Sequence, residues 1–146
     1  MRLSGKGVID ENLSALMLDF IEKLNASQFK NGSKTNFDTL TSKEIQVISS
    51  VGEKKMAMGV LSELTSVKSS TLTKISDGLV KKGYLKRLTS DQDRRIVYVQ
   101  LTEKGLKVRA DILKKRRETI NSVLGTLGFE EQVVMLNAMK KLNKIF

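Results

Sequence analysis

The 146-residue sequence predicts an α+β fold that is mainly α with a small β-hairpin. Near both ends of the chain, apolar residues recur every three or four positions, which is typical of amphipathic helices. In the middle, two short helical segments joined by a turn precede two β-type runs with a polar tip between them. We therefore expect one domain over residues 1–146, a size that can bury a core.

The first expected helix covers residues 8–29, and the polar, glycine-containing segment 31–38 that follows is expected to be a loop. The apolar stripe of this helix consists of Ile9, Leu13, Leu16, Met17, Phe20 and Leu24. Acidic residues and a lysine cover the opposite face. The stripe is explained either by an internal core or by a surface that a second chain covers.

The second helix is predicted from its boundaries. Thr41 and Glu44 have the spacing of a capping box, in which each side chain binds the backbone N–H of the other residue. Gly52 is expected to end this helix, and residues 56–58 are expected to form a small strand.

Residues 59–64, a turn at 65–67 and residues 69–82 have the spacing of a helix-turn-helix, with Gly83 ending the second helix. Its expected buried residues are Leu72, Ile75, Leu79 and Val80. In this motif the start of the second helix meets DNA bases in the major groove. The residues there are Lys68, Ser69, Ser70, Thr71, Thr73 and Lys74, which can bond to phosphates or bases. Hydroxyls also cap helices, so an ordinary amphipathic helix is the alternative.

The β-type runs at about residues 84–88 and 96–101 predict a hairpin whose tip holds Asp93, Arg94 and Arg95. A hairpin directly after a helix-turn-helix makes a winged helix-turn-helix, here over residues 40–101. Arginine at such a tip is attracted by the negative potential of a narrow DNA minor groove. The alternative is a solvated turn in which Asp93 is a local ion-pair partner.

Thr102 is expected to cap a long helix that ends near Leu124, and a last helix is expected from about Glu130 after a break at 125–128. The basic block 114–117 is interpreted as a solvated helix face that adds to the long-range field. Because the winged region has its own core, we expect residues 8–30 and 103–146 to be dimerisation helices. A two-fold dimer presents two recognition helices about 34–36 Å apart to a near-palindromic site.

Composition narrows the partners and the chemistry. The net charge of +10 favours nucleic acid, with an anionic membrane or an acidic protein as other partners. The chain has no cysteine and no histidine, and it shows no catalytic constellation, so we expect no metal, no cofactor and no enzyme activity. No apolar run approaches the roughly 20 residues of a membrane span, and cytoplasm is the expected location. Aromatic residues are only 5% of the chain, which argues against peripheral membrane binding.

Several motifs give the sequence a family resemblance. They are Leu40–Glu44, Leu72–Ile75 with Leu79, Lys82–Leu85, Asp93–Arg95 and Leu101–Gly105. In these the chain resembles the MarR family of bacterial winged-helix transcription regulators. The resemblance implies a homodimer built from the first helix and the last two, and a recognition helix carrying Thr71, Thr73 and Lys74. It also implies that Arg94 or Arg95 enters the minor groove while Asp93 holds the tip, and that a small ligand or an oxidant releases the protein from DNA.

The chain departs from the family pattern in three ways. Lys68 stands where members often have a small hydroxyl residue, which adds a phosphate contact or shifts the cap to a neighbour. Without cysteine it lacks thiol-oxidation sensing, and without histidine it fits zinc sensing poorly. By resemblance, a ligand would sit between the dimer helices and the DNA-binding lobe, where Phe20 and Leu24 are candidate lining residues.

The function that the sequence favours is a sequence-specific regulator of transcription that binds double-stranded DNA, acts as a repressor and associates with the nucleoid. The alternative is a winged-helix interaction module whose basic face binds an acidic protein. Saturable binding of one palindromic DNA segment over competitor DNA would separate the two hypotheses.

Overall fold

A computed structural model describes residues 11–27 and 39–146. These residues form two compact units, which we call the winged unit (39–115) and the helical unit (11–27 with 116–146). The predicted loop at 31–38 and both ends of the first predicted helix lie outside the described residues.

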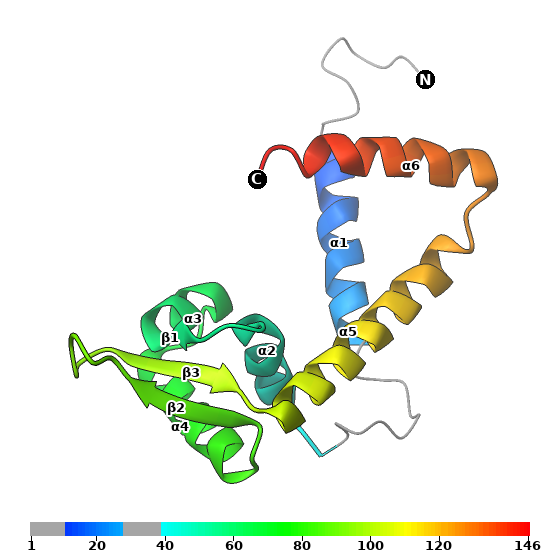
Figure 1. Cartoon of the computed structure of the whole chain (residues 1–146). Coiled ribbons are helices and arrows are strands. Elements are labelled where there is room, and N and C mark those ends of the chain that lie inside the picture. The colour runs from blue at the N-terminus through cyan, green and yellow to red at the C-terminus, as the bar shows by residue number, and fades with distance from the viewer. Residues whose placement is uncertain (1–10, 28–38) are drawn as a thin grey trace. The chain divides into compact units, whose positions relative to one another are not determined.

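The winged unit follows the predicted order of elements. It contains α2 (Ser42–Val51), β1 (Met56–Ala57), α3 (Met58–Thr65), α4 (Ser69–Lys81), β2 (Leu85–Thr89), β3 (Val97–Leu101) and the start of α5 (Glu103–Leu124). The three strands make an antiparallel sheet in the order β1-β3-β2 (Figure 1). Both the small strand and the hairpin were predicted, although β3 begins at Val97 rather than at Ile96.

The start of α2 has the predicted capping box. The Glu44 N–H donates to Thr41 Oγ1 at 3.2 Å, and the Thr41 N–H donates to Glu44 Oε2 at 2.9 Å. Glu44 is buried, and its other oxygen Oε1 accepts a hydrogen bond from Lys82 Nζ at 2.8 Å. Burial raises the pKa of Glu44, but the bonds from Lys82 and Thr41 and the charge of Lys82 outweigh it and lower the pKa below its ordinary value.

The core of the winged unit is closed. Its side chains with no exposed surface include Val47, Ile48, Leu61, Leu72, Leu79 and Val99. On α4 the prediction that Val80 is buried was wrong, since 37% of it is exposed, while Ser76 is fully buried. Residues 72, 76 and 79 lie on one stripe of the helix. Val80 follows Leu79 directly, and successive residues of a helix point about 100° apart, so Val80 lies off this stripe. Ser76 is small enough for this stripe, and its hydroxyl lies 3.9 Å from Met58 Sδ.

The end of α4 is joined to the start of α5 by a backbone hydrogen bond, in which the Thr102 N–H donates to Tyr84 O at 3.0 Å. Gly83 has φ of 82°, its N–H donates to Val80 O, and the Tyr84 N–H donates to Leu79 O. These bonds form a Schellman motif, the glycine stop that the sequence predicts. The predicted cap of α5 is present, because Thr102 Oγ1 accepts a bond from the Gly105 N–H at 3.1 Å.

The helical unit consists of α1 (Glu11–Ser27), the last part of α5 and α6 (Phe129–Leu142). The predicted break at 125–128 separates α5 from α6. None of the residues whose burial is described in this unit is buried, although all three helices carry large apolar side chains. Within residues 11–27 and 39–146, no helix is both long enough and apolar enough to span a membrane.

Candidate nucleic-acid interface

The turn between α3 and α4 is held by hydrogen bonds from both sides. Ser66 adopts the left-handed conformation, with φ of 53° and ψ of 28°. Ser62 Oγ donates to Val67 O at 2.6 Å, and Gln46 Nε2 donates to Thr65 O at 3.2 Å. Val67 is 6% exposed and anchors the turn in the core. The start of α4 therefore stands at a fixed angle to α3, as a recognition helix requires.

The first turn of α4 is open to solvent. Lys68 is the N-cap residue, and its side chain makes no capping hydrogen bond. The six residues predicted to meet the major groove are all exposed: Lys68, Ser69, Ser70, Thr71, Thr73 and Lys74. An uncapped helix start combines outward N–H groups with the positive end of the helix dipole, which favours phosphate. Lysine in the place of a capping hydroxyl thus leaves an anion-binding end with an added positive charge.

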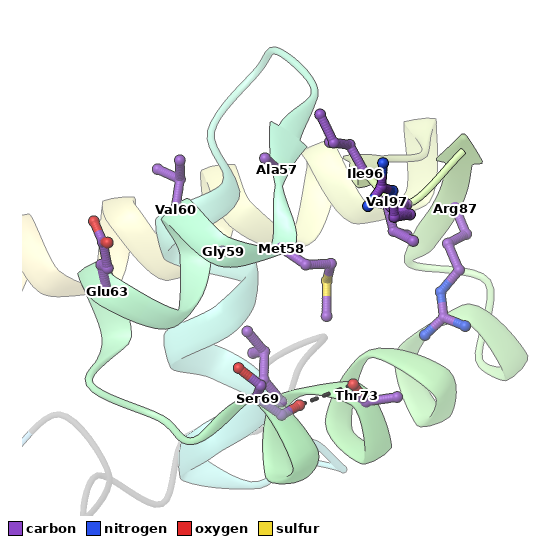
Figure 2. Close-up of a pocket in the computed structure, with 12 residues that line it drawn as sticks. Ala57, Met58, Gly59, Val60, Glu63, Ser69, Thr73, Arg87, Ile96 and Val97 are labelled. Atoms are coloured by element: carbon purple, nitrogen blue, oxygen red, sulfur yellow. Dashed lines mark hydrogen bonds between the residues drawn. The ribbon is translucent and has the colours of Figure 1, made fainter. Parts of the chain in front are cut away.

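Helix geometry divides these residues among different sides of α4. Ser70 and Lys74 lie opposite the buried stripe and point away from the core. Ser69 and Thr73 lie on the flank that faces the tip-side end of the hairpin, and Thr71 lies on the other flank. The Thr73 hydroxyl donates to Ser69 O at 2.8 Å, so its proton is already used within the helix (Figure 2). Ser70, Thr71 and Lys74 are therefore better placed than Thr73 to donate to a ligand outside α4.

Hydrogen bonds between nearby residues order the hairpin tip. The Ser90 N–H donates to Ile96 O at 3.2 Å, and the Ile96 N–H donates to Asp93 O at 3.0 Å. Ser90 Oγ accepts bonds from the N–H groups of Gln92 and Asp93. The tip is thus a defined turn, in which Ile96 is 39% exposed rather than part of the strand.

Asp93 and the two arginines occupy different positions in this turn. Asp93 Oδ1 accepts from the Arg95 N–H at 3.0 Å and from Arg95 Nε at 3.4 Å. The Arg95 side chain is nevertheless 93% exposed. Arg94 is exposed too, and no ion pair within the described part of the chain holds its guanidinium. Two cations are therefore presented at the tip, one braced by Asp93 and the other open.

A cavity of about 640 Å³ lies between α4 and the tip-side end of the hairpin, where Arg95, Ile96 and Val97 line it (Figure 2). The start of α3 forms its wall, with Met58 pointing into the space. Arg87 extends from β2 toward α4, where its Nη2 lies 2.6 Å from Asp77 Oδ1. Sequence reasoning missed this ion pair, because 10 positions of chain and a change from helix to strand separate its partners, so no local spacing rule links them.

Two further predicted features lie in the helical unit or at its edge. Phe20 and Leu24 line an apolar cavity of about 520 Å³ formed by α1, the end of α5 and α6, and their role in ligand binding stays a prediction. The basic block on α5 is not one solvated face. Lys114 and Arg117 are exposed, but Lys115 and Arg116 are half-buried.

Comparisons with known proteins agree with this architecture. A model of the SarA/Rot transcriptional regulators matches residues 28–119. The repressor MprA of Escherichia coli K12 is 28% identical over 110 residues, which span 75% of this chain and 60% of MprA. FabT of Streptococcus pneumoniae, solved in complex with DNA, has a TM-score of 0.72 at 22% identity, covering 92% of this chain and 95% of FabT.

The structure of MarR from Escherichia coli has a TM-score of 0.71 at 21% identity, and the match covers 92% of this chain and 97% of the MarR chain. The resemblance to MarR regulators and the winged helix-turn-helix fold predicted from the sequence are thereby confirmed. Since the matched segment covers more than half of the chain, the protein belongs to the SarA/Rot family of transcriptional regulators.

Proposed function

We propose that this regulator binds duplex DNA as a homodimer and represses transcription. The observation that carries the proposal is the pairing of two cationic features on the winged unit. One is the uncapped, lysine-flanked start of α4, and the other is the hairpin tip with Arg94 and Arg95. The proposal assigns the first feature to the major groove and the second to the minor groove.

Within α4, the proposal gives Ser70, Thr71 and Lys74 the outward contacts to bases and phosphates. Lys68 and the first N–H groups bind a backbone phosphate, which positions the helix without reading sequence. Ser69 and Thr73 support the flank beside the hairpin. At the tip, Arg94 is the inserted cation because no ion pair within the described residues holds it, and Asp93 keeps the turn in shape through Arg95.

The dimer is proposed on the exposed apolar surface of the helical unit, which includes Leu16 of α1 and Leu136 of α6. A second copy of the chain repeats both cationic features, so a near-palindromic site is the matching DNA. Because its proposed partner is DNA, the protein is expected to act in the bacterial cytoplasm, at the nucleoid. We also propose that a small molecule releases the protein from DNA, with Phe20 and Leu24 as candidate contacts. The cavity that these two residues line is shared with Leu136, Met139 and Leu142 of the proposed dimer surface, so the effector would bind at the edge of that surface. Membership of a family of transcriptional regulators favours this function over the alternative, in which the basic face binds an acidic protein.

Arg94→Ala tests the proposal. We expect this variant to bind its preferred DNA at least roughly tenfold more weakly. The slope of log affinity against log salt concentration should become less steep by about one unit, because one cation no longer lies among the DNA phosphates. Fluorescence anisotropy with a labelled duplex, chosen by the parent protein from a random-sequence pool, measures both quantities.

Arg117→Ala is the matched control, because it removes an exposed arginine from α5 and leaves the hairpin intact. Unchanged affinity of Arg94→Ala, with the parent binding tightly, would show that Arg94 is not the residue that enters DNA. Failure of the parent to select any duplex from the pool would overturn the function itself.

A further inference from the structure

Asp77 is the one acidic residue of α4. It lies three residues after Lys74 and four before Lys81, so it shares their side of the helix. This is the side that the proposed function turns toward DNA, where a carboxylate is repelled by phosphates. The structure supplies a reason for an acid at this position, since Asp77 Oδ1 lies 2.6 Å from Arg87 Nη2.

Arg87 is well placed to hold the hairpin through this contact. Its Cα lies opposite that of Val99 in the β2–β3 register, and directly opposed residues project to the same face of a sheet. Val99 is fully buried in the core. Arg87 therefore leaves the sheet on its inner face, and its long side chain reaches the edge of that face to meet α4 (Figure 2).

Leu72 and Leu79 of α4 pack with Val99 in the core, but packing is incomplete at the end of this junction nearer the hairpin tip. The cavity of about 640 Å³ lies between α4 and the tip-side end of the hairpin, and it includes Thr73, Arg87, Arg95 and Val97 in its lining. Where such a space replaces side-chain contacts, the dispersion forces that would hold two elements at one angle are lost. The ion pair spans this junction and joins the two elements directly.

We propose that Asp77 and Arg87 are positioning residues that set the angle between the recognition helix and the wing, and thereby the DNA sequences that the protein accepts. The inference rests on the proposed DNA binding. A fixed angle fixes the offset between the contact in the major groove and the contact in the minor groove. A duplex whose shape matches that offset binds both, and other duplexes lose one of them.

The size of the effect follows from the exposure of the pair. The side chains are 39% and 50% exposed, so the pair contributes at most about 1 kcal/mol, which corresponds to roughly a fivefold change in an equilibrium constant. We expect thermal stability to change little when the pair is broken. The preference for the selected duplex over a shuffled one should fall roughly fivefold.

The experiment compares Asp77→Asn, Arg87→Gln and the double variant on two probes. One probe is the duplex that the parent protein selects from a random-sequence pool, and the other has the same composition in shuffled order. Asp77→Asn removes a negative charge, so its affinity for the shuffled duplex should rise while its affinity for the selected duplex falls. The double variant should lose no more preference than either single variant, because the two residues act as one unit.

Glu63→Gln is the matched control. Glu63 lines the same cavity and is exposed, but it belongs to α3 and its carboxylate forms no ion pair within the described residues. This variant should keep the preference of the parent protein.

Two results would overturn the inference while leaving DNA binding intact. The first is an equal rise in the affinity of Asp77→Asn for both duplexes, which would mean that Asp77 acts through charge alone. The second is an equal loss by Arg87→Gln on both duplexes with an unchanged preference in Asp77→Asn, which would make Arg87 a simple phosphate contact. A parent protein without any preference would overturn the proposed function, and the inference with it.

Discussion

The winged unit and the helical unit are both built from amphipathic helices, but the apolar stripes are buried in the first and exposed in the second. In the winged unit, the apolar stripes of α2, α3 and α4 meet each other and the sheet, and residues such as Ile48, Leu61 and Leu72 have no exposed surface. In the helical unit, Leu136 is 55% exposed, Val134 is 68% exposed and Phe129 is 81% exposed. An amphipathic pattern thus predicts that a stripe will be buried without saying which chain will bury it.

Helices α1 and α6 of the helical unit each carry several exposed, large apolar side chains. The large apolar residues of α1 include Leu13, Leu16, Met17 and Leu18, and those of α6 include Val133, Leu136, Met139 and Leu142. Monomeric proteins rarely expose apolar patches larger than a few hundred Å², and larger ones mark interfaces. The winged unit carries its own core, whereas the helical unit requires a partner surface, and the proposed partner is a second copy of the chain.

Leu72→Ala tests the winged side of this contrast and has the largest expected effect. The Leu72 side chain has no exposed surface, so its removal leaves a cavity and should cost about 2–5 kcal/mol of unfolding free energy. Urea denaturation followed by circular dichroism measures this loss. Because the core lies within one chain, the loss should be equal at low and at high protein concentration. A loss that grows on dilution would mean that the winged unit also depends on a partner.

Leu136→Glu tests the helical side. A carboxylate placed in an apolar interface must be desolvated, so we expect the dimer dissociation constant to rise at least roughly a hundredfold, or about 3 kcal/mol. Analytical ultracentrifugation should then show monomers at concentrations where the parent is dimeric. Leu64→Glu is the matched control, because Leu64 is 61% exposed on α3 of the winged unit. A Leu136→Glu protein that stays dimeric would place the interface elsewhere.

Glu44→Gln probes the one buried carboxylate within the described residues, and it sharpens the contrast within the winged unit. Glutamine keeps the shape but loses the charge that Lys82 and the Thr41 N–H bind. Hydrogen bonds to charged groups are the stronger ones, so we expect a loss of about 1–2 kcal/mol, measured by thermal unfolding at neutral pH. A stability equal to that of the parent protein would show that the capping box does not need the charge.

The same residue predicts a dependence on pH. The pKa of Glu44 in the folded protein lies below its ordinary value of 4.5, so its contribution is complete above that value. The contribution is lost as the pH falls through the lower, folded pKa. From about pH 5 to about pH 3, the parent should therefore lose more stability than Glu44→Gln does. Parallel curves for the two proteins would contradict the lowered pKa.

The parts of the fold that the sequence predicted well are those with local causes. The capping box of Thr41, the glycine stop at Gly83 and the cap at Thr102 each depend on residues within a few positions. The hairpin followed from two β-type runs on either side of a polar tip. The six exposed residues at the start of α4 were also found by local spacing.

The failures have long-range causes. Val80 was predicted to be buried because it is apolar, whereas the small, polar Ser76 occupies the inward stripe and lies against Met58 of another helix, a contact that the sequence of α4 does not contain. The Asp77–Arg87 pair depends on the angle between a helix and a strand. Half-burial of Lys115 and Arg116 likewise reflects contacts that a run of basic residues cannot predict.

Gly105 gives the fold a mechanical property. A side-chain carbon at this position would overlap the carbonyl oxygen of Tyr84, so the backbones of α5 and of the segment after α4 lie in direct contact. Thr102 and Lys104 add bonds to the carbonyls of Gly83 and Lys82. Two backbones in direct contact shift less easily than two side chains, because a side chain can change its rotamer. The first turn of α5 and the end of the recognition helix are therefore expected to move as one body.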